Sequence, residues 1–202
     1  MLEQLPTSGD AVRLRIVSQI AQNDAPLPYE EAFGGSDGEA AEFDDAFPED
    51  IEDAALRYLD SRSEEHGEEL TRIEQNTEAA LSVQNGRVTI SYDDSELSED
   101  LPTLTQITFT LDEPKLVAIV RSGGTSSMYI LEEGRRHVCE LSAGGITLPV
   151  TFSSGRVRNT VSDGTGVILL EYTVEISGAV SQHTIMKIEV LPDPDGGTRE
   201  FG

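Results

Sequence analysis

Arg121 is the residue whose chemistry is hardest to explain by packing alone. It ends the apolar run KLVAIVRSGG, and strand alternation places it on the same face as Val117 and Ile119. Arginine is rarely buried without a partner. Its guanidinium could clamp a carboxylate or phosphate of a ligand at the mouth of a barrel. It could instead pair with an inner Glu or cap loop carbonyls, and we favour this structural role.

Tyr129 and Tyr172 complete the candidate ligand-binding set. Both stand in strand-like stretches, SSMYILEE and GVILLEYTVEIS, and could line the same cavity as Arg121. They could also fill that cavity, and filling is what large aromatic side chains more often do. We therefore predict a ligand-binding set of Arg121, Tyr129 and Tyr172, and we assign no catalytic residue.

The potential metal ligands do not form a recognised pattern. His66, His137 and His183 are far apart in the sequence, and none stands in an HxH or HExxH motif. Cys139 follows His137 by two residues and shares its strand face, but a zinc site needs three or four converging ligands. The carboxylates within residues 44–53 lack the order of a calcium loop. We expect neither a metal nor a cofactor.

Nucleophile and acid–base motifs are equally weak. The chain has no GxSxG, and RSGGTSS lies between two strands, whereas a phosphate cradle needs a following helix. Glu132 and Glu133 fall in a turn, where exposure would keep both ionised. Glu171 and Glu175 alternate with apolar residues, so we predict that they lie on a solvated outer face.

The elements that would position these residues are β-strands. AVRLRIVSQI alternates as a half-buried strand does, and from Glu69 onward strand patterns follow one another with turn signals between most neighbours. Asn85 and Gly86 supply the positive φ angles of a tight hairpin. We predict an all-β fold of eight to ten antiparallel strands, as a closed barrel or a sandwich. A barrel of that size holds side chains only, or one small ligand.

A strongly acidic segment interrupts the strands. Residues 24–69 hold 17 acidic and two basic residues, in a chain of 202 residues whose net charge is −24. Within it, PEDIEDAALRYLDSR is a helix candidate, with Pro48 in the first turn. We predict one domain over residues 1–202, with a partly helical or disordered insertion at 24–67 and a flexible tail at 192–202.

The charge balance limits the partners. An acidic surface repels nucleic acid and anionic membranes, whereas a small molecule or a basic protein remains possible. The single cysteine and the absence of a visible secretory signal fit a cytoplasmic protein. The oligomeric state stays open.

The second half of the chain also carries a family pattern. KLVAIVRSGGTSSMYILEEGRRHVCEL, followed by ITLPVTFSSGRVRN and GVILLEYTVEISGAVSQHTIMKIEV, resembles the YwiB-like uncharacterised bacterial β-barrel proteins. With the first strand and the hairpin around Asn85, the resemblance spans about residues 11–23 and 68–191. It implies a calycin-like or lipocalin-like barrel. The family usually joins its first two strands by a short turn, whereas about 45 residues intervene here.

Three functions are compatible with these observations. We favour a non-enzymatic, cytoplasmic barrel that binds a small ligand. The alternative is an interaction module, in which the acidic segment with Phe33, Phe43 and Phe47 folds onto a basic protein. A hydrolase-type enzyme at the barrel mouth, using Arg121 and a histidine, is the third hypothesis.

Overall fold

A computed structural model describes residues 8–28, 69–94, 103–123, 125–143, 146–176 and 179–201. All regular structure in these ranges is β-strand. Among them, no helix has the length and apolar character that a membrane crossing needs. The predicted helix PEDIEDAALRYLDSR lies outside the described residues, as does His66.

Eleven strands follow one another in the described ranges. The first five are β1 (Ser8–Pro28), β2 (Glu69–Gln84), β3 (Arg87–Asp93), β4 (Thr103–Thr110) and β5 (Glu113–Gly123). The remaining six are β6 (Thr125–Glu132), β7 (Arg136–Ala143), β8 (Ile146–Asn159), β9 (Gly166–Ile176), β10 (Ala179–Pro192) and β11 (Thr198–Glu200).

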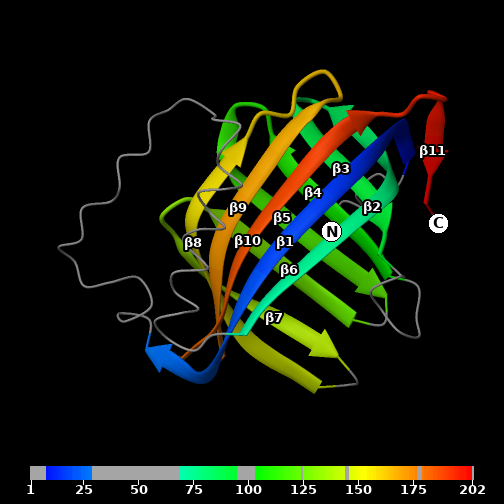
Figure 1. The fold of residues 1–202 in the computed structure, drawn as a ribbon. Coiled ribbons are helices and arrows are strands. Elements are labelled where there is room, and N and C mark those ends of the chain that lie inside the picture. The colour runs from blue at the N-terminus through cyan, green and yellow to red at the C-terminus, as the bar shows by residue number, and fades with distance from the viewer. Residues whose placement is uncertain are drawn as a thin grey trace.

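The strands form a closed antiparallel barrel and not a sandwich. Each strand from β1 to β10 pairs with its sequence neighbour, and β10 pairs back with β1 from Val12 to Pro28. This last pairing closes the ring of ten strands, which curves around a common interior in Figure 1. Closure satisfies the backbone groups that an open sheet would leave at its two edges.

The predicted tight hairpin between β2 and β3 is present. Asn85 and Gly86 have φ angles of 52° and 77°, and Val83 pairs with Val88 across the turn. Two successive positive φ angles match the right-handed twist of the flanking strands. The Asn-Gly dipeptide therefore sets the register that brings Ile90 and Tyr92 into the barrel.

Most of the barrel interior in the described residues is an apolar core. Leu14, Ile90, Ile107, Leu131 and Ile168 are all almost fully buried in it. They come from five different strands, and residues two apart on each strand share the inner face. The wider cluster also contains Val12, Ile16, Ala79, Leu81, Val88, Phe109, Val117, Ile119, Val150, Phe152, Val157, Val161, Leu170, Ile188 and Val190.

Two segments differ from the sequence pattern. The alternation of β1 ends near Asn23, yet its backbone continues to Pro28 after a register shift between Gln22 and Leu27. Such an irregularity accommodates proline, which has no backbone N–H to donate to a neighbouring strand. In the stretch 192–202, predicted as a flexible tail, β11 pairs with the first residues of β1.

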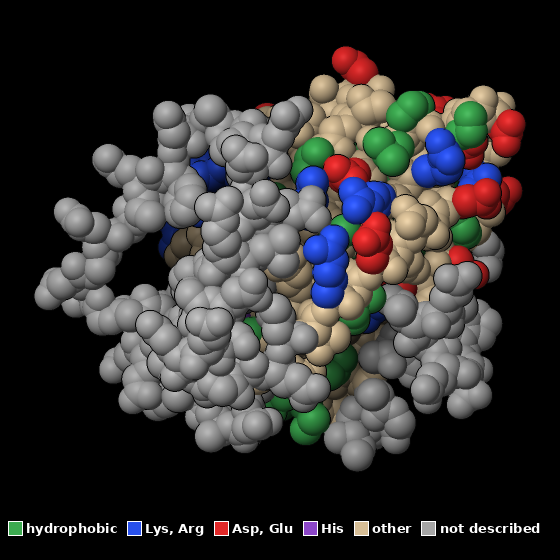
Figure 2. Space-filling model, viewed as in Figure 1, with side chains coloured by type: hydrophobic (Ala, Val, Ile, Leu, Met, Phe, Trp, Pro, Cys, Tyr) green, Lys and Arg blue, Asp and Glu red, His purple; other side chains and the backbone are tan. Residues whose placement is uncertain are grey.

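The outer face of β10, β1 and β2 carries paired charges. Arg15 contacts Glu74 at 2.9 Å and Glu189 at 3.1 Å, so one guanidinium joins three adjacent strands. Figure 2 shows Lys and Arg side chains alternating with Asp and Glu over this face. Because these groups are substantially exposed, their contribution to stability is small.

Candidate functional site

A polar cluster lies inside the barrel, where the inward-facing side chains of β3, β4, β5 and β6 change from apolar to polar. Tyr92 on β3 pairs with Thr105 on β4, Thr105 with Arg121 on β5, and Arg121 with Ser127 on β6. Directly paired residues share a face of the sheet, so this row points into the barrel as Tyr92 does. The prediction that Arg121 shares the inner face of Val117 and Ile119 is confirmed.

Arg121 is paired with Asp94, the residue that follows β3. The guanidinium Nη2 donates to Asp94 Oδ2, and Thr105 Oγ1 donates to the same oxygen at 3.2 Å. The Asp94 side chain is 1% exposed, whereas that of Arg121 is 32% exposed. Burial alone would lower the pKa of Arg121, but the Asp94 carboxylate raises it overall. Arg121 is therefore a charged group that remains open to solvent on one side.

The second oxygen of Asp94 has no bonding partner among the described residues. Asp94 Oδ1 is buried and accepts no hydrogen bond from them, although Oδ2 accepts two. A buried acceptor without a donor is costly and commonly marks a strained or functional position. Among the described residues of the cluster, the charges of Arg121 and Asp94 balance, but the hydrogen bonding of Asp94 is incomplete.

Tyr129 lies beside Arg121 on the inner face. Arg121 pairs with Ser127 and Tyr129 pairs with Ile119, so Arg121 and Tyr129 are diagonal neighbours. The Ser127 hydroxyl donates to the Tyr129 phenol oxygen at 2.8 Å. This bond leaves the phenol proton of Tyr129 free to be donated elsewhere.

An aromatic chain connects Tyr129 to Tyr172. The Tyr129 ring centroid lies 4.6 Å from that of Phe152 on β8, and the Phe152 centroid lies 6.0 Å from that of Tyr172 on β9. Burial raises the pKa of Tyr172 to about 12 and also raises the pKa of Tyr92. Both phenols are therefore neutral at physiological pH.

The wall next to Tyr129 is incomplete. β6 and β7 pair only through residues 125–127 and 141–143, although a short turn joins the two strands. At the turn, Gly134 N–H donates instead to Ser154 O of β8 at 2.9 Å. Between these points, residues 128–131 and 137–140 do not pair with each other. We call this gap in the ladder the β6–β7 seam, and Tyr129 is only half-buried beside it.

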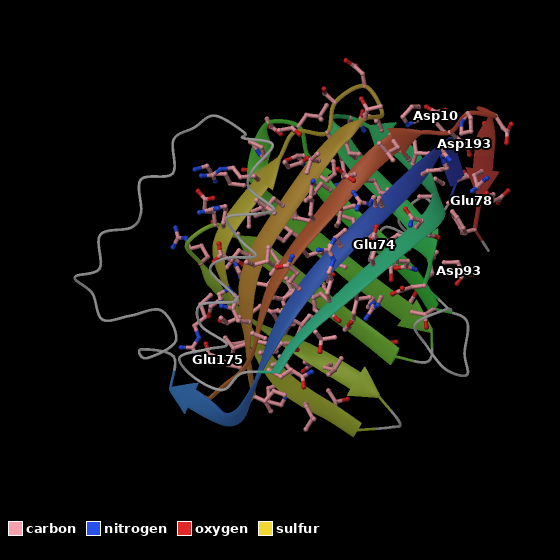
Figure 3. All side chains as sticks on the ribbon, in the orientation of Figure 1. Asp10, Glu74, Glu78, Asp93, Glu175 and Asp193 are labelled. Atoms are coloured by element: carbon pink, nitrogen blue, oxygen red, sulfur yellow. The ribbon has the colours of Figure 1, made fainter. Side chains whose placement is uncertain are left out.

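The outer face near β9 corrects one prediction. Glu175 is not solvated: its side chain is 1% exposed, and it accepts hydrogen bonds from Arg136 at 2.7 Å and from Ser153 at 3.2 Å. Strand alternation identified the face, but it could not show that this part of the face is buried. Figure 3 labels Glu175 at the end of the barrel opposite Asp10.

The other titratable candidates contact different partners outside the polar cluster. Glu133 contacts Lys115 at 2.6 Å and also binds Arg158, whereas Glu132 lies 3.2 Å from His137. His183 lies 3.4 Å from Glu171 on the outer face. Within the described ranges, no three His, Cys, Asp or Glu residues converge as metal ligands.

Sequence reasoning missed four polar members of the cluster, which are Tyr92, Asp94, Thr105 and Ser127, and it also missed the neighbouring Phe152. A signal for Asp94 was present, because the period of two that runs through Ile90 and Tyr92 continues to position 94. The partner expected for Arg121 was an inner Glu or loop carbonyls, and the residue found is this Asp.

The comparisons with known proteins agree with the fold. Residues 59–188 match a family model described as a domain of unknown function, DUF1934. The chain belongs to the DUF1934 family. The structure is also similar to the crystal structure of the ywiB protein from Bacillus subtilis. The two share 12% identity and a TM-score of 0.55, over 91% of this chain and 93% of the other. No curated protein matches the sequence.

The structural similarity to the ywiB protein and the DUF1934 match together confirm the predicted resemblance to YwiB-like barrels. The matched residues contain β2 to β9 whole, and with them Arg121, Asp94, Tyr129 and Tyr172. At 12% identity, the similarity to the ywiB protein supports the barrel and carries no information about a ligand.

Proposed function

We propose that this DUF1934 protein is a calycin-like, non-enzymatic binding protein that holds a small organic ligand at the Arg121 end of its barrel. One observation carries the proposal: the Arg121 guanidinium is ion-paired to a buried carboxylate and yet remains partly exposed. Arginine has five N–H donors, and the contacts with Asp94 and Thr105 engage two of them. The remaining donors are available to a ligand.

The surroundings of Arg121 support the same function. Tyr129 offers a phenol proton and an aromatic ring, and it stands at the β6–β7 seam, where the wall lacks ladder pairing. Binding sites in barrels combine an apolar wall with a few fixed polar groups. Here the accessible part of that wall is the ring of Tyr129, which contacts the buried Phe152 and, through it, Tyr172. The low cysteine content is consistent with action in the cytoplasm.

Capture of small molecules from a metabolite extract tests this function. The purified protein is incubated with the extract, desalted and analysed by native mass spectrometry. We expect a retained molecule that is lost in Arg121→Gln and weakened in Tyr129→Phe. The matched control is Arg15→Gln, because Arg15 is also paired to carboxylates and is 35% exposed, but on the outer face.

Two results contradict the proposal. The first is that the wild-type protein retains nothing. The second is that a captured molecule is held equally by Arg121→Gln and Arg15→Gln, which would place its site away from the barrel end.

A further inference from the structure

The charges in the polar cluster already cancel. Arg121 is ion-paired to Asp94, and no third charged side chain contacts either of them in the described part of the chain. Tyr92 and Tyr129 lie on strands beside the pair, and Tyr172 is connected to Tyr129 through Phe152, so the aromatic neighbours carry hydroxyl groups. An anionic ligand would therefore add an uncompensated negative charge close to a carboxylate that is 1% exposed.

The net charge of the whole chain also disfavours an anionic ligand. A net charge of −24 raises the energy of any further anion that approaches the surface at low salt. A cationic ligand would be attracted over long distances, but the accessible member of the pair is the guanidinium of Arg121, which would repel it. An uncharged ligand incurs neither repulsion.

The hydrogen-bonding groups that face the ligand are donors. Arg121 contributes N–H groups, and Tyr129 contributes the phenol proton left free by the bond from Ser127. As diagonal neighbours on adjacent strands, the two can reach a single acceptor oxygen. The ring of Tyr129, tilted against Phe152, then gives the rest of the ligand an aromatic surface.

We propose that the ligand is an uncharged molecule in which a carbonyl oxygen, as in an amide or lactam, is attached to an aromatic or apolar ring. The oxygen accepts from Arg121 and Tyr129, and the ring packs against the half-buried ring of Tyr129, which contacts Phe152. This inference rests on the proposed function, since it names the ligand class of the same site.

Isosteric pairs of aryl amides and aryl carboxylates test this ligand class. Phenylacetamide with phenylacetate, and benzamide with benzoate, are titrated into ¹⁵N-labelled protein at low salt, and the amide shifts of β5 and β6 are followed. We expect each amide to bind about tenfold more tightly than its carboxylate. In Asp94→Asn we expect the affinity for the carboxylates to rise about tenfold. The affinity for the amides should change by less than about threefold.

Salt dependence provides a measurement that needs no variant. Raising the ionic strength screens the repulsion of the carboxylates, so their affinity should rise, whereas that of the amides should stay constant. Equal or tighter binding of the carboxylates at low salt overturns the inference and leaves the proposed binding function standing. Absence of shifts with all four compounds at millimolar concentration also overturns the ligand class, while capture from the extract decides the binding function separately.

Discussion

Arg121 and Asp94 form one ion pair but differ in their exposure to solvent. The carboxylate is buried, whereas about a third of the guanidinium side chain remains in contact with solvent. Removing one partner of a buried pair is costly mainly because the other charge is left without compensation. Asp94 cannot recover its hydration, whereas Arg121 can turn toward water. The two single substitutions should therefore differ in their effect on stability.

We predict that Arg121→Met lowers the free energy of unfolding by about 3 kcal/mol, because it leaves the Asp94 carboxylate buried and unpaired. Asp94→Asn should cost only about 1 kcal/mol, because the amide keeps hydrogen-bonding groups in place. Urea unfolding of both variants measures the difference. Arg15→Met, on the exposed outer face, serves as the control and should cost less than about 1 kcal/mol. Equal costs for Arg121→Met and Asp94→Asn would contradict the burial argument.

Among the elements, β6 and β7 depart most from a regular barrel wall. The two strands pair at residues 125–127 and 141–143 and share no further ladder pairs, while β7 keeps its full ladder with β8. Val138, in the middle of β7, is 72% exposed. Backbone groups of residues 128–131 and 137–140 that point across the seam therefore have no partner in the ladder, and water is the alternative partner for those that are exposed.

We predict that the seam exchanges amide hydrogens faster than the rest of β6 and β7. Amides of residues 128–131 and 137–140 that point across the seam should exchange about 100-fold faster than amides of the same strands bonded to β5 or β8. Hydrogen exchange followed by NMR at single-residue resolution measures this. The bonded amides serve as internal controls, and uniform protection along both strands would show that the seam is closed in solution.

The whole barrel depends on contacts between distant parts of the chain. β1 pairs with β10, and β11 pairs with the start of β1, so both ends of the described chain meet on one strand. Charged side chains also join distant segments: Glu133, in the turn after β6, binds Lys115 on β5 and Arg158 on β8, and accepts from Val157 N–H. Figure 1 shows how the strands that carry these residues wrap around one interior.

We predict that the contribution of Glu133 to stability is lost in acid. Burial raises the pKa of Glu133, but the bonds from Lys115 and Val157 and the charge of Arg158 outweigh it, so the pKa is lowered. The folded protein therefore holds this carboxylate ionised at a pH where the unfolded chain binds a proton. Its stabilising effect is full above about pH 4.5 and disappears as the pH falls through the lowered pKa.

Chemical unfolding at several pH values measures this dependence. With a side chain 20% exposed, Glu133→Gln should cost about 1 kcal/mol at pH 7 and progressively less below pH 4.5. Glu140→Gln, which changes an exposed carboxylate on β7, is the control for the general effect of charge. A cost for Glu133→Gln that stays constant down to pH 3 would contradict the prediction.

The patterns of alternation and turn residues predicted much of this molecule. Alternation with a period of two predicted which side chains of each strand face the interior. Asn85 and Gly86 predicted a tight hairpin, and Arg121 was identified as a charged residue on an apolar face. These features are local, because they depend on backbone sterics and on residues close together in the chain. They could be deduced without knowing which strands become neighbours.

Only the tertiary structure decided what surrounds those residues. Barrel closure through β10 and β1, the partner of Arg121, the contact of Tyr129 with Phe152 and the burial of Glu175 all join segments that are distant in sequence. A strand pattern indicates which side of a sheet a residue occupies, but not which residues lie on the neighbouring strands. The sequence by itself therefore determined the strands and their faces. The choice of partners came from the three-dimensional packing, because a contact energy depends on which atoms meet.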